Sequence, residues 1–214
     1  MLECKHFPNR EAWLKGRKDF PGIGASEAAS IVGASSWMSA SELWQLKTGR
    51  KEPKDLSLNE QVSYGTHAEE HIRALFMLKH PEYKLEYRPF DFMYQKERPW
   101  LRCTLDGELV VPDGERGTLE VKTAQIQSKS QYAQWNNRIP DHYLVQLLHQ
   151  FLATGYSFAY LTAELMYTDG SSTLRSYYFR AQDYYDDMEW LLEEEEKFWD
   201  SVLNQKTPNV KLFL

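Results

Sequence analysis

Two kinds of hydrophobic spacing follow one another along the chain. Apolar residues that recur every three or four positions predict helices, and apolar residues that alternate with polar ones or form short runs predict strands. The predicted helices span residues 11–18, 26–32, 39–48, 66–80, 142–153 and about 182–205. The predicted strands span residues 84–94, 100–111, 117–123, 157–167 and 173–180.

This order of elements predicts an α/β (α+β) fold, with a central mixed β-sheet flanked by helices. With 214 residues, of which 42% are hydrophobic, the chain is long enough for one globular domain with a sizeable core. Within residues 1–214 we expect a helical part at about 10–55, a core at about 60–180 and an acidic C-terminal helix at about 182–205.

The strands at 100–111 and 117–123 predict a hairpin, because residues 112–117 contain the Pro, Asp and Gly of a turn. Alternation along the second strand sends Glu120 and Lys122 to one face and Val121 to the other. Folding the strands about the turn brings Asp106 within a residue or two of the position opposite Glu120. We therefore expect two carboxylates and an amine to converge.

Such a patch suits a metal ion. Mg²⁺ takes oxygen ligands, usually one or two carboxylates with water and substrate phosphate, so Asp106 and Glu120 are enough for the side-chain part. Lys122 can hold or deprotonate a water, or neutralise charge on a phosphate under attack. The alternative is an exposed hairpin with a Glu-Lys pair. The bare pattern favours that alternative, since short motifs match by chance.

A second candidate site lies near the N-terminus. A glycine-rich turn at 22–25 leads into a helix whose N-cap we predict to be Ser26, and free N–H groups at such a start suit a phosphate. Arg17 can add a bidentate contact. The alternative, which the segment alone favours, is that Ser26 is only a cap and Arg17 only a surface base.

Glu69 also has two interpretations. It stands three residues after Thr66, the spacing of a capping box, which gives it a complete structural role at the start of the helix at 66–80. It can instead face the patch of Asp106 and Glu120 as a further carboxylate.

The helix at 142–153 carries Tyr143, Gln146 and Gln150 on one stripe, because they are spaced by three and four residues. A glutamine on this stripe can bond a phosphate, orient Lys122 or simply be solvated.

The formal net charge is −6, which at first argues against a nucleic-acid partner. Nine acidic residues and one basic residue in 183–200 account for −8 of it, which leaves +2 for the remainder. A local basic groove is therefore compatible with the composition. No stretch approaches the roughly 18 apolar residues of a membrane span, and the N-terminus lacks the apolar segment of a signal peptide. We expect a cytoplasmic protein with no membrane partner.

Several motifs together resemble a known family. They are Gly22-Ile23-Gly24-Ala25-Ser26-Glu27-Ala28-Ala29, Gly33-x-Ser35-x-Trp37, Glu42-Leu43-Trp44, Lys47-Thr48-Gly49, Tyr64-Gly65-x-x-x-Glu69, Leu105-Asp106-Gly107, Glu120-Val121-Lys122 and Tyr143-x-x-Gln146. Over residues 13–155 the chain resembles the YqaJ-type viral recombinases, relatives of lambda exonuclease in the PD-(D/E)xK nuclease superfamily.

The resemblance implies a role for each matching residue. Asp106, Glu120 and the Val121 carbonyl would bind Mg²⁺, with Mn²⁺ as a possible substitute. Glu69 would be the helix-borne acid, Lys122 the residue that activates the attacking water, and Gln146 its helix-borne partner. Arg17 and Ser26 would hold the 5′-phosphate of the strand being digested.

The resemblance also implies an activity and partners. Family members digest one strand of linear duplex DNA from 5′ to 3′ and leave 3′ single-strand overhangs. Some close into a homotrimeric ring around DNA, and they work with a single-strand annealing protein in phage recombination. A phage or prophage gene expressed in a bacterial host is the implied origin.

The sequence departs from the family pattern at two positions. Leu105 replaces the proline of the superfamily motif, and Met38 stands where relatives often have lysine. A third contact to the terminal phosphate is therefore not assigned, either to Lys47 or to Arg50. Two alternatives stay open: an endonuclease on the same fold, and a DNA-end-binding recombination scaffold without turnover.

Overall fold

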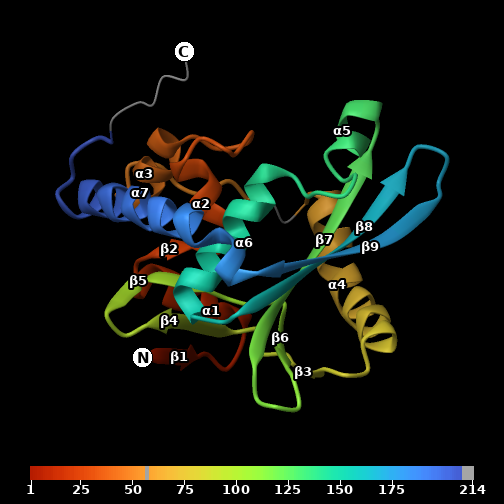
Figure 1. Cartoon of the computed structure of the whole chain (residues 1–214). Helices are drawn as coiled ribbons and strands as arrows, with labels where there is room; N and C mark the ends of the chain where they lie inside the picture. Colours follow the sequence, from red (N-terminus) through yellow and green to blue (C-terminus); the bar gives the residue numbers. More distant parts are fainter. Residues whose placement is uncertain (56–57, 209–214) are drawn as a thin grey trace.

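The computed structural model describes residues 1–55 and 58–208, and its strands form two mixed sheets flanked by helices (Figure 1). The four-stranded sheet has the order β1-β4-β5-β2 and the five-stranded sheet the order β3-β6-β7-β8-β9. The strands are β1 (Leu2–His6), β2 (Ile23–Gly24), β3 (Lys84–Glu86), β4 (Asp91–Gln95), β5 (Arg98–Cys103), β6 (Gly107–Val110), β7 (Arg116–Ile126), β8 (Phe158–Tyr167) and β9 (Ser172–Arg180). The helices are α1 (Arg10–Asp19), α2 (Ala25–Ile31), α3 (Ala40–Lys47), α4 (Glu60–Lys79), α5 (Lys129–Ala133), α6 (Asp141–Thr154), the 3₁₀ helix η1 (Ala181–Tyr184) and α7 (Tyr185–Leu203). The predicted α/β class is confirmed, with the strands divided between two sheets.

Helices α4 and α6 cover opposite faces of the five-stranded sheet (Figure 1). Successive side chains of a strand point to opposite faces. Leu119 and Val121 of β7 therefore pack with Phe76 of α4 in one buried cluster. Glu120, between them, meets Gln146 of α6 on the other face.

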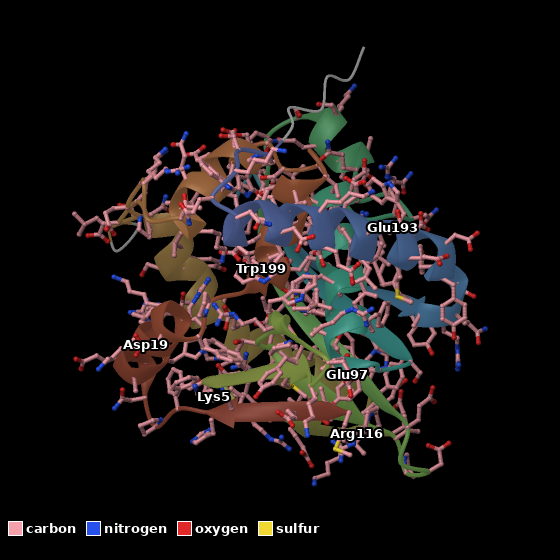
Figure 2. All side chains as sticks on the ribbon, turned by 90° about the vertical axis from the view of Figure 1, so that its left-hand side faces the viewer. Lys5, Asp19, Glu97, Arg116, Glu193 and Trp199 are labelled. Atoms are coloured by element: carbon pink, nitrogen blue, oxygen red, sulfur yellow. The ribbon has the colours of Figure 1, made fainter. Side chains whose placement is uncertain are left out.

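Helix α6 also packs on the four-stranded sheet, so it lies between the two sheets. Its Ala153 shares a buried cluster with Leu101 and Cys103 of β5. On another side of β5, Trp100 stacks on Trp199 of α7 with 6.1 Å between ring centroids, and Figure 2 shows Trp199 on α7. The core is therefore continuous from one sheet through α6 to the other.

The strands predicted at 84–94 and 100–111 are wrong as continuous strands, because the chain passes from one sheet to the other within each. The first divides into β3 and β4 around Pro89, which has no N–H to donate to a strand ladder. The second divides into β5 and β6. There the Thr104 hydroxyl donates to the Asp91 carbonyl at 2.8 Å, and Asp106 turns its carboxylate to the backbone of β7. This break sets Asp106 between the two sheets.

The capping box predicted at Thr66 and Glu69 is wrong, because α4 begins six residues earlier, at Glu60. Its cap is Asn59, whose side-chain oxygen accepts the Val62 N–H at 3.1 Å. Thr66 lies inside the helix and donates its hydroxyl to the Val62 carbonyl. Glu69 is thus a mid-helix residue with no capping role.

The N-cap predicted at Ser26 is also wrong. The cap of α2 is Gly24, which has no side chain to accept an N–H of the first turn. Its own N–H donates to Glu27 Oε2 at 2.7 Å, the contact that the third helical residue makes in a capping box. Ser26 is the second residue of the helix and is exposed. Its hydroxyl makes no hydrogen bond within the described part of the chain.

Other local predictions are confirmed. The segments at 11–18, 39–48 and 142–153 form α1, α3 and α6, and those at 157–167 and 173–180 form the hairpin of β8 and β9. Gly155 ends α6 with a φ of 72°, a left-handed conformation that suits glycine. Among the residues that the structure describes, no helix has the length and apolar character needed to cross a membrane.

Candidate active site

The side chains singled out in the sequence line one pocket of about 330 Å³, to which both sheets contribute. The lining includes Arg17, Ser26, Glu69, Asp106, Glu120, Val121, Lys122 and Gln146. The N-terminal candidate site and the hairpin patch are therefore two ends of a single pocket, which we call the phosphate end and the acid end.

The acid end is built at the break between β5 and β6. Gly107 pairs with Leu119, so the antiparallel register, continued by one residue, sets Asp106 opposite Glu120. Asp106 Oδ2 accepts the Val121 backbone N–H at 2.8 Å. The predicted juxtaposition of Asp106 and Glu120 is confirmed.

Glu120 is 3% exposed, and three donors hold its carboxylate. The Lys122 amine is 2.6 Å from Oε1, Gln146 Nε2 donates to Oε1 at 2.5 Å, and Gln150 Nε2 donates to Oε2 at 2.5 Å. A solvated role for these glutamines is thus wrong, since both are buried. Gln150 was not among the predicted site residues, although its spacing of four from Gln146 was the signal that could have added it.

The charges at the acid end are unbalanced. Burial and the neighbouring charge of Glu120 raise the pKa of Asp106 well above its ordinary value. Burial works against the charged form of Lys122, but the charges of Glu120 and Asp106 outweigh it, so the pKa of Lys122 is raised. The Lys122 amine is therefore charged, and the carboxyl groups of Asp106 and Glu120 lie close enough to repel each other when both are ionised. A bound cation would reduce this repulsion.

Glu69 reaches the acid end from α4. Its Oε2 lies 3.7 Å from Nη1 of Arg73, one turn further along the helix, and the same nitrogen donates to the Asp106 carbonyl at 3.4 Å. Arg73 is 7% exposed, and its guanidinium lies 3.8 Å from the centre of the Tyr87 ring. Arg73 thus connects α4 to the segment between β5 and β6 that carries Asp106. Arg73 was not among the predicted site residues, although its i,i+4 spacing from Glu69 was the signal that could have added it.

The phosphate end is formed by α1, α2 and β5. Ser26 presents its hydroxyl from α2, and Arg17, on α1, has a side chain that is 41% exposed. Arg17 Nη2 is 3.9 Å from Glu27, a loose pair, because Lys47 approaches the same carboxylate at 2.6 Å. The Lys47 amine also donates to the Gly22 carbonyl. These two contacts hold Lys47 outside the lining of the pocket.

The donor set at the acid end fits a hard divalent cation. Asp106 and Glu120 supply carboxylate oxygens and Val121 a backbone carbonyl, and Mg²⁺ completes such sets with water and phosphate. Among residues 1–55 and 58–208, no group of three or more His, Cys, Asp and Glu side chains is arranged to hold a metal ion. The site thus offers a partial shell of the kind that Mg²⁺ uses, rather than a closed protein cage.

Comparison with other sequences shows that the residues around this pocket lie in a stretch that matches a known family. The family model for the YqaJ-like viral recombinase domain matches residues 12–157, a stretch that contains every predicted site residue. The YqaJ protein of Bacillus subtilis (strain 168) is 29% identical over 141 residues. That match covers 66% of this chain and 41% of the relative, so the chain corresponds to about two fifths of the relative's length.

Solved structures share the fold. The alkaline exonuclease LHK-Exo from Laribacter hongkongensis superposes with a TM-score of 0.65 at 14% identity, over 92% of this chain and 94% of that one. A phage-related exonuclease from Haemophilus somnus 129PT gives a TM-score of 0.55 at 11% identity, over 89% and 99%. With the family model matching most of its length, the chain belongs to the YqaJ-like viral recombinase domain family.

Proposed function

We propose that this protein is a Mg²⁺-dependent 5′→3′ exonuclease that digests one strand of linear double-stranded DNA. The observation that carries the proposal is the single pocket, which joins an acid and lysine cluster at one end to Arg17 and Ser26 at the other. The first end suits phosphodiester hydrolysis, and the second suits a terminal phosphate. Family membership supports the same assignment.

Asp106, Glu120 and the Val121 carbonyl are the residues that would hold the metal. Mg²⁺ bound there would polarise the scissile phosphate and lower the pKa of the attacking water. Gln146 and Gln150 fix the Glu120 carboxylate, so that its oxygens are oriented before a cation arrives.

The remaining residues act on water and charge. Lys122 is the residue that we propose activates the attacking water, by orienting it with its charged amine, and the same charge offsets the negative charge that develops on the phosphate. Its amine lies 5.0 Å from the centre of the Tyr143 ring, which restricts its position. Glu69, held by Arg73, is the further carboxylate beside this water.

Arg17 and Ser26 hold the 5′-terminal phosphate and so determine which bond reaches the acid end. A cleavage that leaves a 5′-phosphate on the shortened strand regenerates the end that the pocket recognises. Repeated cycles then proceed from 5′ to 3′, release mononucleotides and leave a 3′ overhang.

The family setting extends the proposal to partners. We propose that the overhang passes to a single-strand annealing protein, that the protein acts in the cytoplasm of a phage-infected or lysogenic bacterium, and that it assembles as a homotrimeric ring on DNA. Mn²⁺ is expected to substitute for Mg²⁺, since both accept oxygen ligands.

The test is nucleotide release from linear duplexes with 5′-phosphate or 5′-hydroxyl ends and from covalently closed circles. We expect Mg²⁺-dependent digestion of the phosphorylated linear duplex. Lys122→Ala should lose at least about 100-fold in rate, as expected when a donor that stabilises developing charge is removed. Lys197→Ala, on the exposed side of α7, is the matched control and should keep the wild-type rate.

Other outcomes decide against the proposal. Cutting of closed circles would indicate an endonuclease. DNA-end binding that survives Glu120→Ala, without turnover on any substrate, would indicate a recombination scaffold.

A further inference from the structure

Arg102 is a buried arginine of β5 that lines the phosphate end and has no role in the function proposed above. It is 4% exposed, and its Nη2 donates to the Arg17 carbonyl at 3.1 Å. In the part of the chain that the structure describes, its other terminal nitrogen, Nη1, has no hydrogen-bond partner. A buried, unpaired donor is uncommon, because it has given up its hydrogen bonds to water.

Among the described residues, Arg102 also lacks a direct ion-pair partner, although the charge of Glu27 favours its charged form from a longer distance. Within residues 1–55 and 58–208, no carboxylate forms an ion pair with it, and its guanidinium lies 4.6 Å from the centre of the Phe92 ring. Burial lowers the pKa of Arg102 to about 10, so the group still carries its charge at neutral pH. Burying a charge without a direct partner is unfavourable, which favours a site that receives an anion.

The surrounding charges match a particular anion. Three cations, Arg17, Lys47 and Arg102, share the single carboxylate of Glu27, which Lys47 approaches at 2.6 Å and Arg17 at 3.9 Å, so positive charge is in excess at this end of the pocket. A terminal phosphate carries a charge of about −1.5 to −2 at pH 7, whereas a phosphodiester within the strand carries about −1. This excess of positive charge therefore favours a strand terminus over the interior of the backbone.

Glycine at position 22 allows this arrangement. A Cβ there would lie 2.5 Å from the Trp100 carbonyl oxygen and 3.2 Å from Nε of Arg102. Gly22 thus lets the turn before β2 pass directly over Arg102. By contrast, Met38 packs with Ile23 and Trp44 in an apolar cluster away from the pocket lining, so it offers no third contact.

We propose that Arg102 is a direct ligand of the 5′-terminal phosphate, completing the set begun by Arg17 and Ser26. The inference rests on the proposed function, because it takes the same pocket as the site for a DNA end. Arg102 supplies a buried, fixed positive charge in the lining of the pocket. The more exposed Arg17 contacts the same phosphate from α1.

The experiment measures binding without catalysis. A hairpin duplex with one open end, carrying either a 5′-phosphate or a 5′-hydroxyl, is titrated in EDTA, and the ratio of the two dissociation constants is the readout. We expect wild type to prefer the phosphate, and Arg102→Met to lower this preference at least tenfold, as loss of one charge-assisted hydrogen bond predicts. Arg98→Met, on the same strand but paired with Glu196 at 3.1 Å, is the matched control and should keep the ratio.

Circular dichroism establishes that each variant is folded. If Arg102→Met fails to fold, Arg102→Lys tests the same point, since it keeps the charge but loses the forked donors. A folded Arg102 variant with the wild-type ratio would overturn the proposal and make this arginine a structural support for Arg17. A wild-type ratio near one would also overturn it, whereas the exonuclease proposal stands or falls on Mg²⁺-dependent digestion.

Discussion

At the scale of single residues, the contacts of Glu120 show how a buried carboxylate is held in one orientation. A carboxylate that is 3% exposed would ordinarily become protonated or be excluded from the core. Here Lys122, Gln146 and Gln150 donate to it from two elements. Gln150 also accepts the Thr118 hydroxyl at 3.1 Å, which fixes the orientation of its amide. Gln150 is thus a positioning residue that acts through Glu120.

Replacing Gln150 tests this role. Gln150→Leu keeps the volume but removes the donor to Glu120 Oε2, so we expect a 10- to 100-fold loss in apparent Mg²⁺ affinity, which is typical when a group that orients a metal ligand is removed. An unsatisfied buried carboxylate oxygen should also cost about 1–3 kcal/mol of stability. Mg²⁺ titrations of nuclease rate, with urea unfolding alongside, measure both effects.

Gln182→Leu, at an exposed position of η1, is the control for the substitution itself. The role assigned to Gln150 is incorrect if the Mg²⁺ dependence of the variant matches that of wild type.

At the scale of elements, α6 connects the acid end to the rest of the protein. Gln146 and Gln150 point to β7, while His149 points to α7 and β5. The His149 ring is fully buried, with Nδ1 2.7 Å from Glu195 Oε1 and Nε2 3.0 Å from the Arg102 carbonyl. Both ring nitrogens face acceptors, so only the doubly protonated imidazole donates to both. The contact with the Arg102 carbonyl fixes the backbone of β5 at Arg102 against α6.

The His149 contact predicts a pH dependence of stability. Burial disfavours the charged imidazole, but Glu195 and the Arg102 carbonyl, with a further contribution from Glu27, outweigh burial and raise its pKa. A raised folded-state pKa means that this stabilisation is complete below the unfolded value of about 6.5 and is lost as the pH rises through the folded value. We therefore expect the free energy of unfolding to fall as the pH rises from 6 to 9.

Urea unfolding across this pH range measures the slope. Glu195→Leu should cost about 3–5 kcal/mol at pH 6, because it breaks a buried pair. The double variant His149→Leu/Glu195→Leu should show a flatter pH profile, whereas His71→Gln, on the exposed face of α4, should keep the wild-type slope. A double variant as steep as wild type would show that the slope arises elsewhere.

At the scale of the whole molecule, the pocket is a junction between the two sheets. Asp106 comes from the crossing between them, Glu120 from the five-stranded sheet, and Glu69 from the helix that covers it. A cation shared by Asp106 and Glu120 would bind only the folded arrangement. Its binding free energy should therefore appear as global stability.

Metal addition and removal test this coupling. At Mg²⁺ concentrations about 100 times Kd we expect about 2.7 kcal/mol of added stability, which for a chain of this size raises Tm by roughly 5–10 °C. EDTA should reverse the shift. Thermal melts of Glu120→Gln should show no shift, and Glu193→Gln, exposed on α7, should behave as wild type. An equal shift in Glu120→Gln would place the bound ion elsewhere.

The sequence by itself determined the features that depend on short-range periodicity and turns. Helix α6, the β8 and β9 hairpin and the proximity of Asp106 to Glu120 follow from side-chain spacing and from a turn of known residues. The family motifs added Arg17 and Ser26, which the local pattern alone could not distinguish from a surface base and a cap. The structural predictions succeeded because each depends on residues that are close in sequence, whereas the assignment of Arg17 and Ser26 to a terminal phosphate stays a prediction.

Only the tertiary structure decided the rest. The division of two predicted strands between the sheets depends on what each half packs against, and the true start of α4 depends on Asn59, so apolar spacing alone misplaced both. The roles proposed for Gln150 and Arg102 rest on contacts with residues that lie 30 and 85 positions away. Whether a buried polar group is satisfied or awaits a ligand is a property of its packed surroundings, and no spacing along the chain records it.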